Sequence, residues 1–349
     1  MDEINTKRHK KLLLEQASRL CLIGSEVLRN PPPSGSCKPL ADILRNKNMI
    51  NFHQEVKELL SKIETVEIIK KIENFRKLDF KKISDTDLFN EISKTISANV
   101  NGIEKAILFP RFATYPPKTR FYRVRALQPE DHYIPLKAMT FEADAWNPPA
   151  QFVKTRGRLN NVNESLLYTS PIQPQIAVEE MKINDGERFC LIVYESISDI
   201  KVTMIGLWED LPELNSEENL KMRLISNFLN DEFTRDVGVG TEFLYRTSER
   251  IVKDYFDLPP RVVQDAWCYP SVASKPSVNV CFRPEIAKDL LELKGVQICN
   301  VKREKNQYLF NCQAIAVGFD EEKKFKYYQI DHPICKGIFP EIQLNKNVS

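Results

Sequence analysis

The stretch PPAQFVKTRGRLNNVNESLLYTS, residues 148 to 170, combines side chains that could hold an anionic ligand with a flat ring. Two arginines, one of them Arg158, stand beside a Gly/Asn-rich turn, and Tyr168 follows on a short apolar strand. Glu179 and Glu180 come shortly afterwards, near the start of a predicted helix. Guanidinium groups bind phosphate oxygens in a bidentate manner, and tyrosine offers an aromatic face with a polar tip. These residue types therefore favour a dinucleotide-like ligand.

Two further segments carry polar residues on predicted strands. In RFYRVR, residues 120 to 125, Arg123 and Arg125 lie two positions apart, so strand alternation places them on the same side. In DAWCYPSVASKPSVNVCF, Ser271 follows an apolar strand and Asn279 begins the next one. Each segment alone also fits an ordinary role, as a charged edge strand or as a loop between strands. Three such segments in this order indicate a common site.

The composition excludes several classes of protein. The chain has 50 Lys and Arg against 48 Asp and Glu, so no dedicated nucleic-acid-binding function is expected. No apolar run approaches the roughly 20 residues of a membrane-spanning helix, and no membrane association is expected. The charged N-terminal segment has no small-residue cleavage site, which argues against secretion. The eight cysteines form no CxxC pair, so we expect reduced thiols and a cytoplasmic location.

Familiar catalytic and metal-binding motifs are missing from the sequence. The chain contains no phosphate-binding GxxxxGKS/T motif, no HExxH and no GxSxG. Its four histidines are isolated from one another, and a zinc site would need ligands scattered over the fold. We therefore expect no metal site.

The N-terminal part of the chain is predicted to be mainly helical. Apolar residues recur at helical spacing over residues 5–30, 40–46 and 52–78, with a Pro-rich break at residues 31–33. A capping cluster that begins at Ser84 predicts another helix, running towards Ile103. We therefore expect an α-helical N-terminal domain over residues 1–108.

After Pro110 the sequence changes to short strands and turns. Strands are predicted over residues 120–127, 166–169, 189–195, 201–207, 265–269 and 278–282, and helices over 175–182, 217–230 and 242–256. The tail from Gly295 to Ile330 alternates apolar and polar residues, which predicts three antiparallel strands. Strands and helices do not alternate regularly, so the fold class is predicted to be α+β, with residues 109–349 as a second domain.

Taken in order, these segments resemble the RES domain family, named for an arginine, a glutamate and a serine. The family carries an arginine in an early strand, a GRxN turn leading to LY, a helix beginning AxxE, and YPS followed by N. The matching residues here are Arg123, Gly157 to Asn160, Leu167 and Tyr168, Ala177 to Glu180, Tyr269 to Ser271, and Asn279. The resemblance covers residues 119 to 285, about half of the chain.

The resemblance implies a fold like that of the ADP-ribosyltransferases and cleavage of NAD at its nicotinamide–ribose bond. It implies catalytic roles for Glu180, Arg158 and Ser271, and NAD-binding roles for Arg123, Asn160, Tyr168 and Asn279. The carboxylate stabilises the oxocarbenium charge that develops on the ribose. The arginines bind the pyrophosphate, the tyrosine packs on a ring, and the serine orients nicotinamide or ribose. NAD is the substrate in this reading, and no metal is required.

The sequence departs from the family pattern in three places. Val124 stands where small members often have an aromatic residue, Asn163 replaces a usual glycine, and the spacing from the strand tyrosine to the glutamate is one residue longer. Asparagine accepts the left-handed conformation better than other non-glycine residues. The AxxE register that begins at Ala177 favours Glu180 as the family glutamate, with Glu179 as the alternative.

The sequence leaves the acceptor and the biological setting open. Water as acceptor makes a glycohydrolase, phosphate a phosphorylase, and a protein side chain an ADP-ribosyltransferase. Many RES relatives are bacterial toxins paired with an antitoxin, so a toxin or defence role with an antitoxin or another protein partner is expected, and the chain could form a homo-oligomer. The alternative from a different class is a non-catalytic RES-like module that binds a nucleotide or a partner protein.

Overall fold

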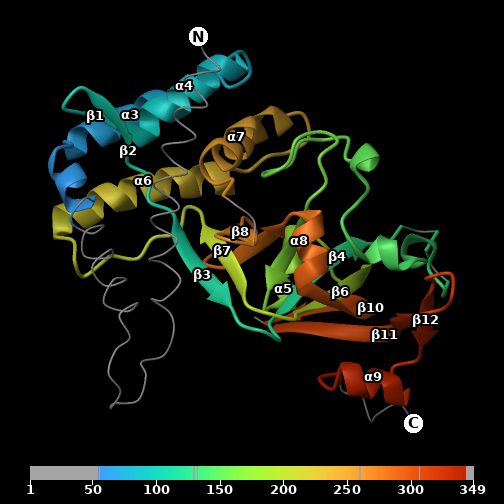
Figure 1. Ribbon diagram of the computed structural model, residues 1–349. Helices are drawn as coiled ribbons and strands as arrows, with labels where there is room; N and C mark the ends of the chain where they lie inside the picture. Colours follow the sequence, from blue (N-terminus) through green and yellow to red (C-terminus); the bar gives the residue numbers. More distant parts are fainter. Residues whose placement is uncertain are drawn as a thin grey trace, which may run out of the picture. The chain divides into compact units, whose positions relative to one another are not determined.

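The computed structural model describes residues 54 to 342, apart from positions 55, 129, 132, 259, 260 and 306. The predicted helices over residues 5–30 and 40–46 and the Pro-rich break at residues 31–33 lie outside this part of the chain. Helices and strands are mixed along the described residues (Figure 1), which confirms the predicted α+β class.

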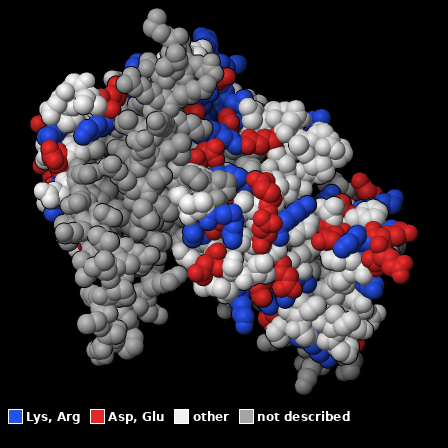
Figure 2. All heavy atoms as spheres, in the orientation of Figure 1, with Lys and Arg blue, Asp and Glu red and all other residues white. Residues whose placement is uncertain are grey.

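The surface carries charges of both signs. Basic and acidic side chains are interspersed over the face drawn in Figure 2, as the near-equal numbers of the two kinds lead one to expect. Among the described residues, no helix combines the length and the apolar composition that a membrane span requires.

The described residues form two compact units, and each is built from separate stretches of chain. The first unit comprises the chain from residue 54 to Thr114, Lys154–Glu164 and Lys201–Pro270, whereas the second comprises Tyr115–Val153, Ser165–Ile200 and the chain from Ser271 to residue 342. These limits differ from the predicted division at residues 108 and 109. The reason is that helices late in the sequence pack on helices near residue 80, and sequence patterns do not show which elements pack together.

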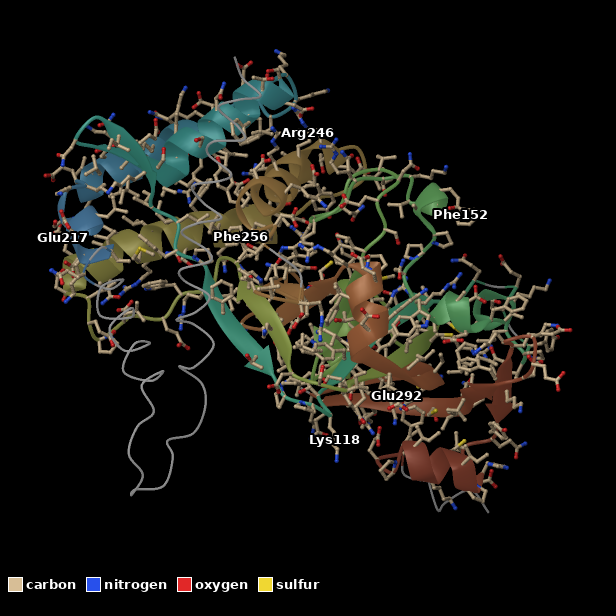
Figure 3. The ribbon with its side chains drawn as sticks, viewed as in Figure 1. Lys118, Phe152, Glu217, Arg246, Phe256 and Glu292 are labelled. Atoms are coloured by element: carbon tan, nitrogen blue, oxygen red, sulfur yellow. The ribbon has the colours of Figure 1, made fainter. Side chains whose placement is uncertain are left out.

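The first unit is mainly helical. Helices α3 (Thr65–Arg76), α4 (Asp85–Ile96), α6 (Ser216–Thr234) and α7 (Tyr245–Tyr255) pack against one another, with the short η4 (Glu242–Leu244) before α7. The buried ring of Phe75 on α3 meets Phe228 on α6 edge-on, with 5.0 Å between ring centroids. Arg246 on α7, labelled in Figure 3, donates to the carboxylate of Asp85 at 2.6 Å. This bond connects α7 to the beginning of α4 and lowers the pKa of Asp85.

The predicted helix over residues 52–78 is interrupted in the structure. A turn at residues 62–64 separates a helical segment that ends at residue 61 from α3. The backbone N–H groups of Lys62 and Ile63 bond to carbonyls three residues back, at 3.2 and 3.4 Å. Such bonds tighten the last turn of a helix and commonly end it. The apolar spacing continues across the break, which explains why the sequence suggested a single helix.

The predicted helix from Ser84 begins as expected, but its extension towards Ile103 is wrong. Ser84 caps α4 by accepting a hydrogen bond from the N–H of Asp87 at 3.1 Å. The helix ends at Ile96, and strands β1 (Ser97–Val100) and β2 (Ile103–Ala106) follow as a hairpin. Asn101 and Gly102 form its two-residue loop with φ values of 55° and 81°. An Asn-Gly pair is the preferred sequence for such a turn, because both positions need positive φ.

The strands of the first unit are few and short. β7 (Ile200–Met204) pairs in parallel with β8 (Ala266–Pro270), and β3 (Arg111–Tyr115) lies on the other side of β7. Gly206, just after β7, has a φ of 66°, and a Cβ at this position would lie 2.7 Å from the backbone nitrogen of Asn230. Only glycine permits this close approach of the strand end to α6.

The second unit is built on an antiparallel sheet with the strand order β12-β11-β10-β6-β4-β5-β9. The strands are β4 (Arg120–Ala126), β5 (Leu167–Pro171), β6 (Arg188–Ser196), β9 (Val278–Phe282), β10 (Leu291–Glu304), β11 (Gln307–Phe319) and β12 (Phe325–Tyr328). The helices are α5 (Pro174–Glu180), α8 (Pro284–Leu290) and α9 (Pro333–Ile338), and the short turns are η1 (Lys137–Met139), η2 (Glu142–Ala145) and η3 (Ala150–Phe152). The three antiparallel strands predicted for the tail are confirmed as β10, β11 and β12.

The two faces of strand β4 pack against different residues. Tyr122 and Val124 belong to a buried cluster that includes Val178 of α5 and Phe339, at the end of α9. Phe121 points the other way and meets the ring of Phe282 edge-on at 5.5 Å. Because side chains alternate along a strand, Arg123 and Arg125 lie on the Phe121 face.

Buried Glu232 on α6 provides a test of electrostatics in the first unit. Its side chain is 2% exposed and is paired with Arg235. Burial raises the pKa of this carboxyl above its ordinary value in spite of the arginine. A raised pKa in the folded state gives stability that is present at low pH and is lost as the pH rises through the folded-state pKa. We therefore expect Glu232→Gln to be more stable than the wild type at pH 7, and the difference to shrink at acid pH.

Thermal unfolding of both proteins at neutral and acid pH checks this prediction. Glu213→Gln, at an exposed position, is the control and is expected to change little at either pH. A variant Glu232→Gln that is clearly less stable than the wild type at neutral pH would mean that the ion pair with Arg235 outweighs the cost of burial.

Candidate functional site

Glu180, the last residue of α5, lies at the centre of a hydrogen-bonded group in the second unit. Its Oε1 accepts from the hydroxyl of Ser271 at 2.5 Å, from the backbone N–H of Val272 at 3.1 Å and from the side-chain amide of Asn279 at 2.7 Å. Buried Val178, together with its neighbours on α5, packs that helix into the core and so fixes the direction of Glu180. Among the described residues, all hydrogen bonds to this carboxylate go to Oε1, which leaves Oε2 as the oxygen available to a ligand.

Ser271 is held by the loop that follows β8. Its backbone N–H donates to the carbonyl of Ser277 at 2.9 Å, and its hydroxyl accepts from the N–H of Ser274 at 3.1 Å while donating to Glu180. The side chain is fully buried. A buried hydroxyl with both a donor and an acceptor partner has a fixed orientation, so this serine also positions the carboxylate.

Asn279, at the start of β9, extends the group to strand β5. Its amide donates to Glu180, and its Oδ1 accepts from the hydroxyl of Ser170 at 2.8 Å. Donor and acceptor partners on opposite ends of the amide determine which way it points. We call Glu180, Ser271, Asn279 and Ser170 the Glu180 cluster. No sequence signal pointed to Ser170, although it follows the Leu-Tyr pair of the RES-like motif by two residues.

The neighbouring carboxylate of Glu179 has a different set of partners. It forms an ion pair with Arg303 of β10, whose Nε and Nη2 lie 2.9 and 2.6 Å from its Oε1. Arg303 also pairs with Asp185 at 2.6 Å. The bonds to Asp185 and Glu179 raise the pKa of the Arg303 guanidinium. Of the two candidate glutamates, Glu180 alone contacts Ser271 and Asn279 in this structure.

Tyr168 lies on the same side of the sheet as part of the Glu180 cluster. It is half-buried on β5 and is paired in register with Cys281 of β9. Tyr168 and Ser170 lie two residues apart on β5, and Cys281 and Asn279 lie two residues apart on β9. By strand alternation, all four side chains project from one face. The ring is thus a near neighbour of Asn279 across the strand pair.

Arg123 projects from the opposite face. Tyr122, its neighbour, is paired in register with Ser170, so Tyr122 and Ser170 share a face and Arg123 lies on the other one. Its Nη1 donates to the backbone carbonyl of Trp146. The structure therefore does not bring Arg123 to the Glu180 cluster, because strand pairing, which the sequence pattern did not reveal, decides the face.

Three side chains of the sheet donate hydrogen bonds to the loop that contains Trp146. Consecutive carbonyls from residue 144 to residue 146 accept hydrogen bonds from Arg125, at 3.5 Å, from the hydroxyl of Tyr194, and from Arg123. Burial raises the pKa of Tyr194 to about 12, so the phenol stays protonated and remains a donor. The expectation that Arg123 and Arg125 lie on one side of their strand is confirmed, and both hold this loop.

Arg158 and Asn160 belong to the first unit, in the stretch Lys154–Glu164. Nη2 of Arg158 donates to the carbonyl of Arg235 at 3.1 Å, and the guanidinium carbon lies 5.2 Å from the ring centroid of Tyr245. Its Nη1 is buried and has no hydrogen-bond partner among the described residues. An unpartnered buried guanidinium nitrogen is costly, and an anionic ligand would satisfy it.

The turn around Asn160 is held by two hydrogen bonds of this residue. The carbonyl of Asn160 accepts from the N–H of Gly157 at 3.0 Å, and its side chain donates to the carbonyl of Asn161 at 2.9 Å. Asn163 has a φ of 60°, so asparagine adopts the left-handed conformation at the position where glycine is usual. Asn160 is buried and shapes the turn.

The described residues contain no group of three or more His, Cys, Asp or Glu side chains that could hold a metal ion. Compared with known proteins, the chain matches no family model and no curated protein. The resemblance to the RES family therefore rests on the residues of the sequence alone.

Proposed function

We propose that this protein binds NAD and breaks the bond between nicotinamide and ribose, with Glu180 as the catalytic carboxylate. The observation that supports this most is the direct contact of Glu180 with Ser271 and Asn279, which lie more than ninety residues away along the chain. These are three of the residues that the RES motif specifies. In this proposal the second unit has an ADP-ribosyltransferase-like fold.

The proposed chemistry uses Glu180 to stabilise charge. As the bond to nicotinamide breaks, its electron pair leaves with the neutral nicotinamide, and positive charge develops on the ribose. The carboxylate of Glu180 stabilises this charge through Oε2, while Ser271 and Asn279 hold Oε1 in place. Preorganisation of this kind is effective because the carboxylate needs no reorientation during the reaction.

The arginines have separate roles in the proposal. Arg158 binds the pyrophosphate, a role supported by its buried, unpartnered Nη1. Arg123 holds the loop at Trp146 and is not assigned to the pyrophosphate, because its guanidinium is bonded to the carbonyl of Trp146. This differs from the expectation that both arginines bind phosphate. Tyr168 packs on a ring of the ligand from the face that bears Asn279.

A second candidate is a non-catalytic nucleotide-binding or interaction module. It is favoured by one specific observation: Oε1 of Glu180 accepts three hydrogen bonds from Ser271, Val272 and Asn279, as expected of a carboxylate that fixes a loop. In that case the Glu180 cluster holds the loop after β8 in place, and NAD stays intact. An antitoxin or other protein partner, or self-association, is compatible with either candidate.

Product analysis distinguishes the possible acceptors. We expect nicotinamide to be released together with ADP-ribose if water is the acceptor, or with phosphorylated ADP-ribose if inorganic phosphate is required. A mass increase on a protein side chain would instead identify an ADP-ribosyltransferase. Purified protein is incubated with NAD in phosphate-free buffer, in phosphate and with a cell extract, and the products are identified by mass spectrometry. Intact NAD under all three conditions would leave the binding module as the better account.

A further inference from the structure

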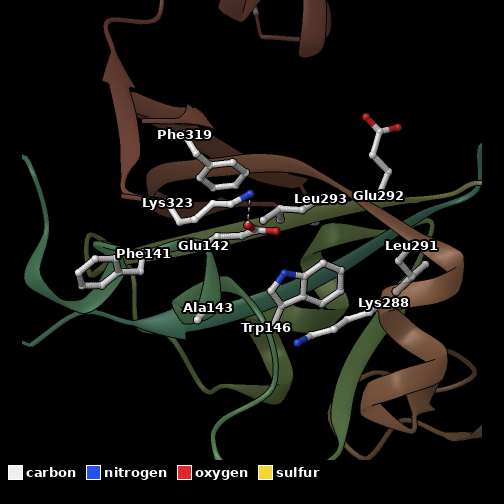
Figure 4. A pocket seen from close by; sticks show the side chains of 10 residues that line it. All are labelled: Phe141, Glu142, Ala143, Trp146, Lys288, Leu291, Glu292, Leu293, Phe319 and Lys323. Atoms are coloured by element: carbon white, nitrogen blue, oxygen red, sulfur yellow. Dashed lines mark ion pairs between the residues drawn. The ribbon is translucent and has the colours of Figure 1, made fainter. Parts of the chain in front are cut away.

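A pocket of about 700 Å³ opens on the second unit, and none of the Glu180 cluster lines it. Its walls come from the η2 turn, the end of α8 with the start of β10, and the chain on either side of the β11–β12 turn (Figure 4). Small-molecule sites in proteins typically have volumes of about 300–1,000 Å³. The pocket is therefore large enough for an organic ligand.

The walls of the pocket are mostly aromatic and aliphatic. They include the side chains of Phe141, Trp146, Leu291, Leu293 and Phe319. Trp146 is held from two sides, since its carbonyl accepts from Arg123 and its ring lies 5.2 Å from the ring of Tyr194. A fixed indole with further rings nearby is a suitable surface for a flat ligand.

The charges around the pocket leave one positive group without a counter-charge. Glu142 pairs with Lys323 at 3.6 Å, shown by the dashed line in Figure 4, and Glu292 pairs with Lys294 at 3.2 Å. Lys288 forms no ion pair with any residue that the structure describes, and its side chain extends beside the ring of Trp146. The remaining charge at the pocket is thus one positive charge next to an aromatic surface.

From this arrangement we infer that the pocket binds a small aromatic monoanion. The ring system of the ligand packs on Trp146 and the neighbouring apolar walls, and its carboxylate or sulfonate group pairs with Lys288. The indole N–H of Trp146, in the wall of the pocket, is a second donor for the anion. This site does not depend on the proposed NAD chemistry, because it shares no residue with the Glu180 cluster.

Anilinonaphthalene sulfonate is the probe that tests the inference, since it is an aromatic monoanion whose fluorescence rises on binding. Its uncharged parent, N-phenylnaphthylamine, has the same rings without the sulfonate. We expect saturable binding of the sulfonate with one site per chain, and at least tenfold weaker binding of the uncharged parent. Equal affinity for the two probes would overturn the assignment of an anion site.

Binding to lysine variants shows whether the probe occupies the pocket. Lys288→Gln is expected to weaken binding of the sulfonate about tenfold and to leave the uncharged probe unaffected. The matched control is Lys302→Gln, an exposed lysine of β10 that does not line the pocket and pairs with Glu304. Binding that is equal in Lys288→Gln and Lys302→Gln would contradict the proposal.

A second pair of variants tests the apolar wall. Leu293→Glu places a negative charge inside the pocket and is expected to abolish binding of the sulfonate. Leu309→Glu adds the same charge to β11 at a side chain that is 46% exposed and lies outside the pocket lining. It should bind the probe as the wild type does. If Leu293→Glu retains full binding, the probe occupies another place and the inference fails.

Discussion

Replacing Glu180 by glutamine is expected to slow nicotinamide release by about a hundredfold to a thousandfold, the usual cost of removing one group that stabilises charge in a transition state. The change removes the negative charge and little else. Glutamine keeps an Oε1 that can still accept from Ser271, Val272 and Asn279, so the loop after β8 should stay in place. Affinity for NAD should change little, because the charge acts mainly on the transition state.

The matched control for this prediction is the neighbouring glutamate. Glu179→Gln weakens the pair with Arg303, which is not part of the Glu180 cluster, and is expected to keep nearly full activity. Rates of nicotinamide release and equilibrium binding of NAD are measured for both variants. An inactive Glu179→Gln together with an active Glu180→Gln would show that the family register is displaced by one residue. Full activity in both variants would show that neither carboxylate is needed for the reaction.

Truncating Phe121 to alanine is expected to destabilise the second unit by about 3–5 kcal/mol, the range for a fully buried phenylalanine. Its ring is fully buried and meets Tyr115 and Phe282 edge-on, at 5.4 and 5.5 Å. The change leaves a cavity beside Phe282 of β9, the strand that also carries Asn279. Urea unfolding followed by circular dichroism measures the loss.

Phe152→Ala is the control for this truncation. Phe152 lies in η3 of the same unit, is labelled in Figure 3 and is 68% exposed, so its removal should cost less than about 0.5 kcal/mol. Similar losses for Phe121→Ala and Phe152→Ala would show that the packing of β4 against β9 does not determine the stability of this unit.

The order of the main strands and helices in the second half of the chain follows from local sequence patterns. Strands with alternating or continuous apolar residues, such as those at residues 120–126 and 278–282, were predicted almost to the residue. Elements without a clear apolar period were not predicted. The Asn101-Gly102 turn was an available signal for the β1–β2 hairpin, but the helical spacing before it concealed the change. Helix α8 is short and begins at Pro284, so it showed no helical period.

The candidate site was predictable in part. The sequence motif grouped Glu180, Ser271 and Asn279, and the structure brings these three residues into contact. Strand alternation correctly placed Arg123 and Arg125 on one side, but it could not decide which side faces Asn279. That depends on the register between β4 and β5, which only tertiary pairing determines.

The pairing of Glu179 with Arg303 could not be predicted for the same reason. The two residues are separated by more than one hundred positions along the chain and meet only because of how the chain folds in the second unit.

We propose that this protein releases nicotinamide from NAD by means of Glu180. The most direct measurement follows NAD labelled in its nicotinamide ring, incubated with the purified full chain and with Glu180→Gln, by chromatography over time. We expect free labelled nicotinamide to accumulate with the wild type and to remain near the background with Glu180→Gln. Label that stays in NAD with the wild type, whether water, phosphate or a protein acceptor is offered, would contradict the account.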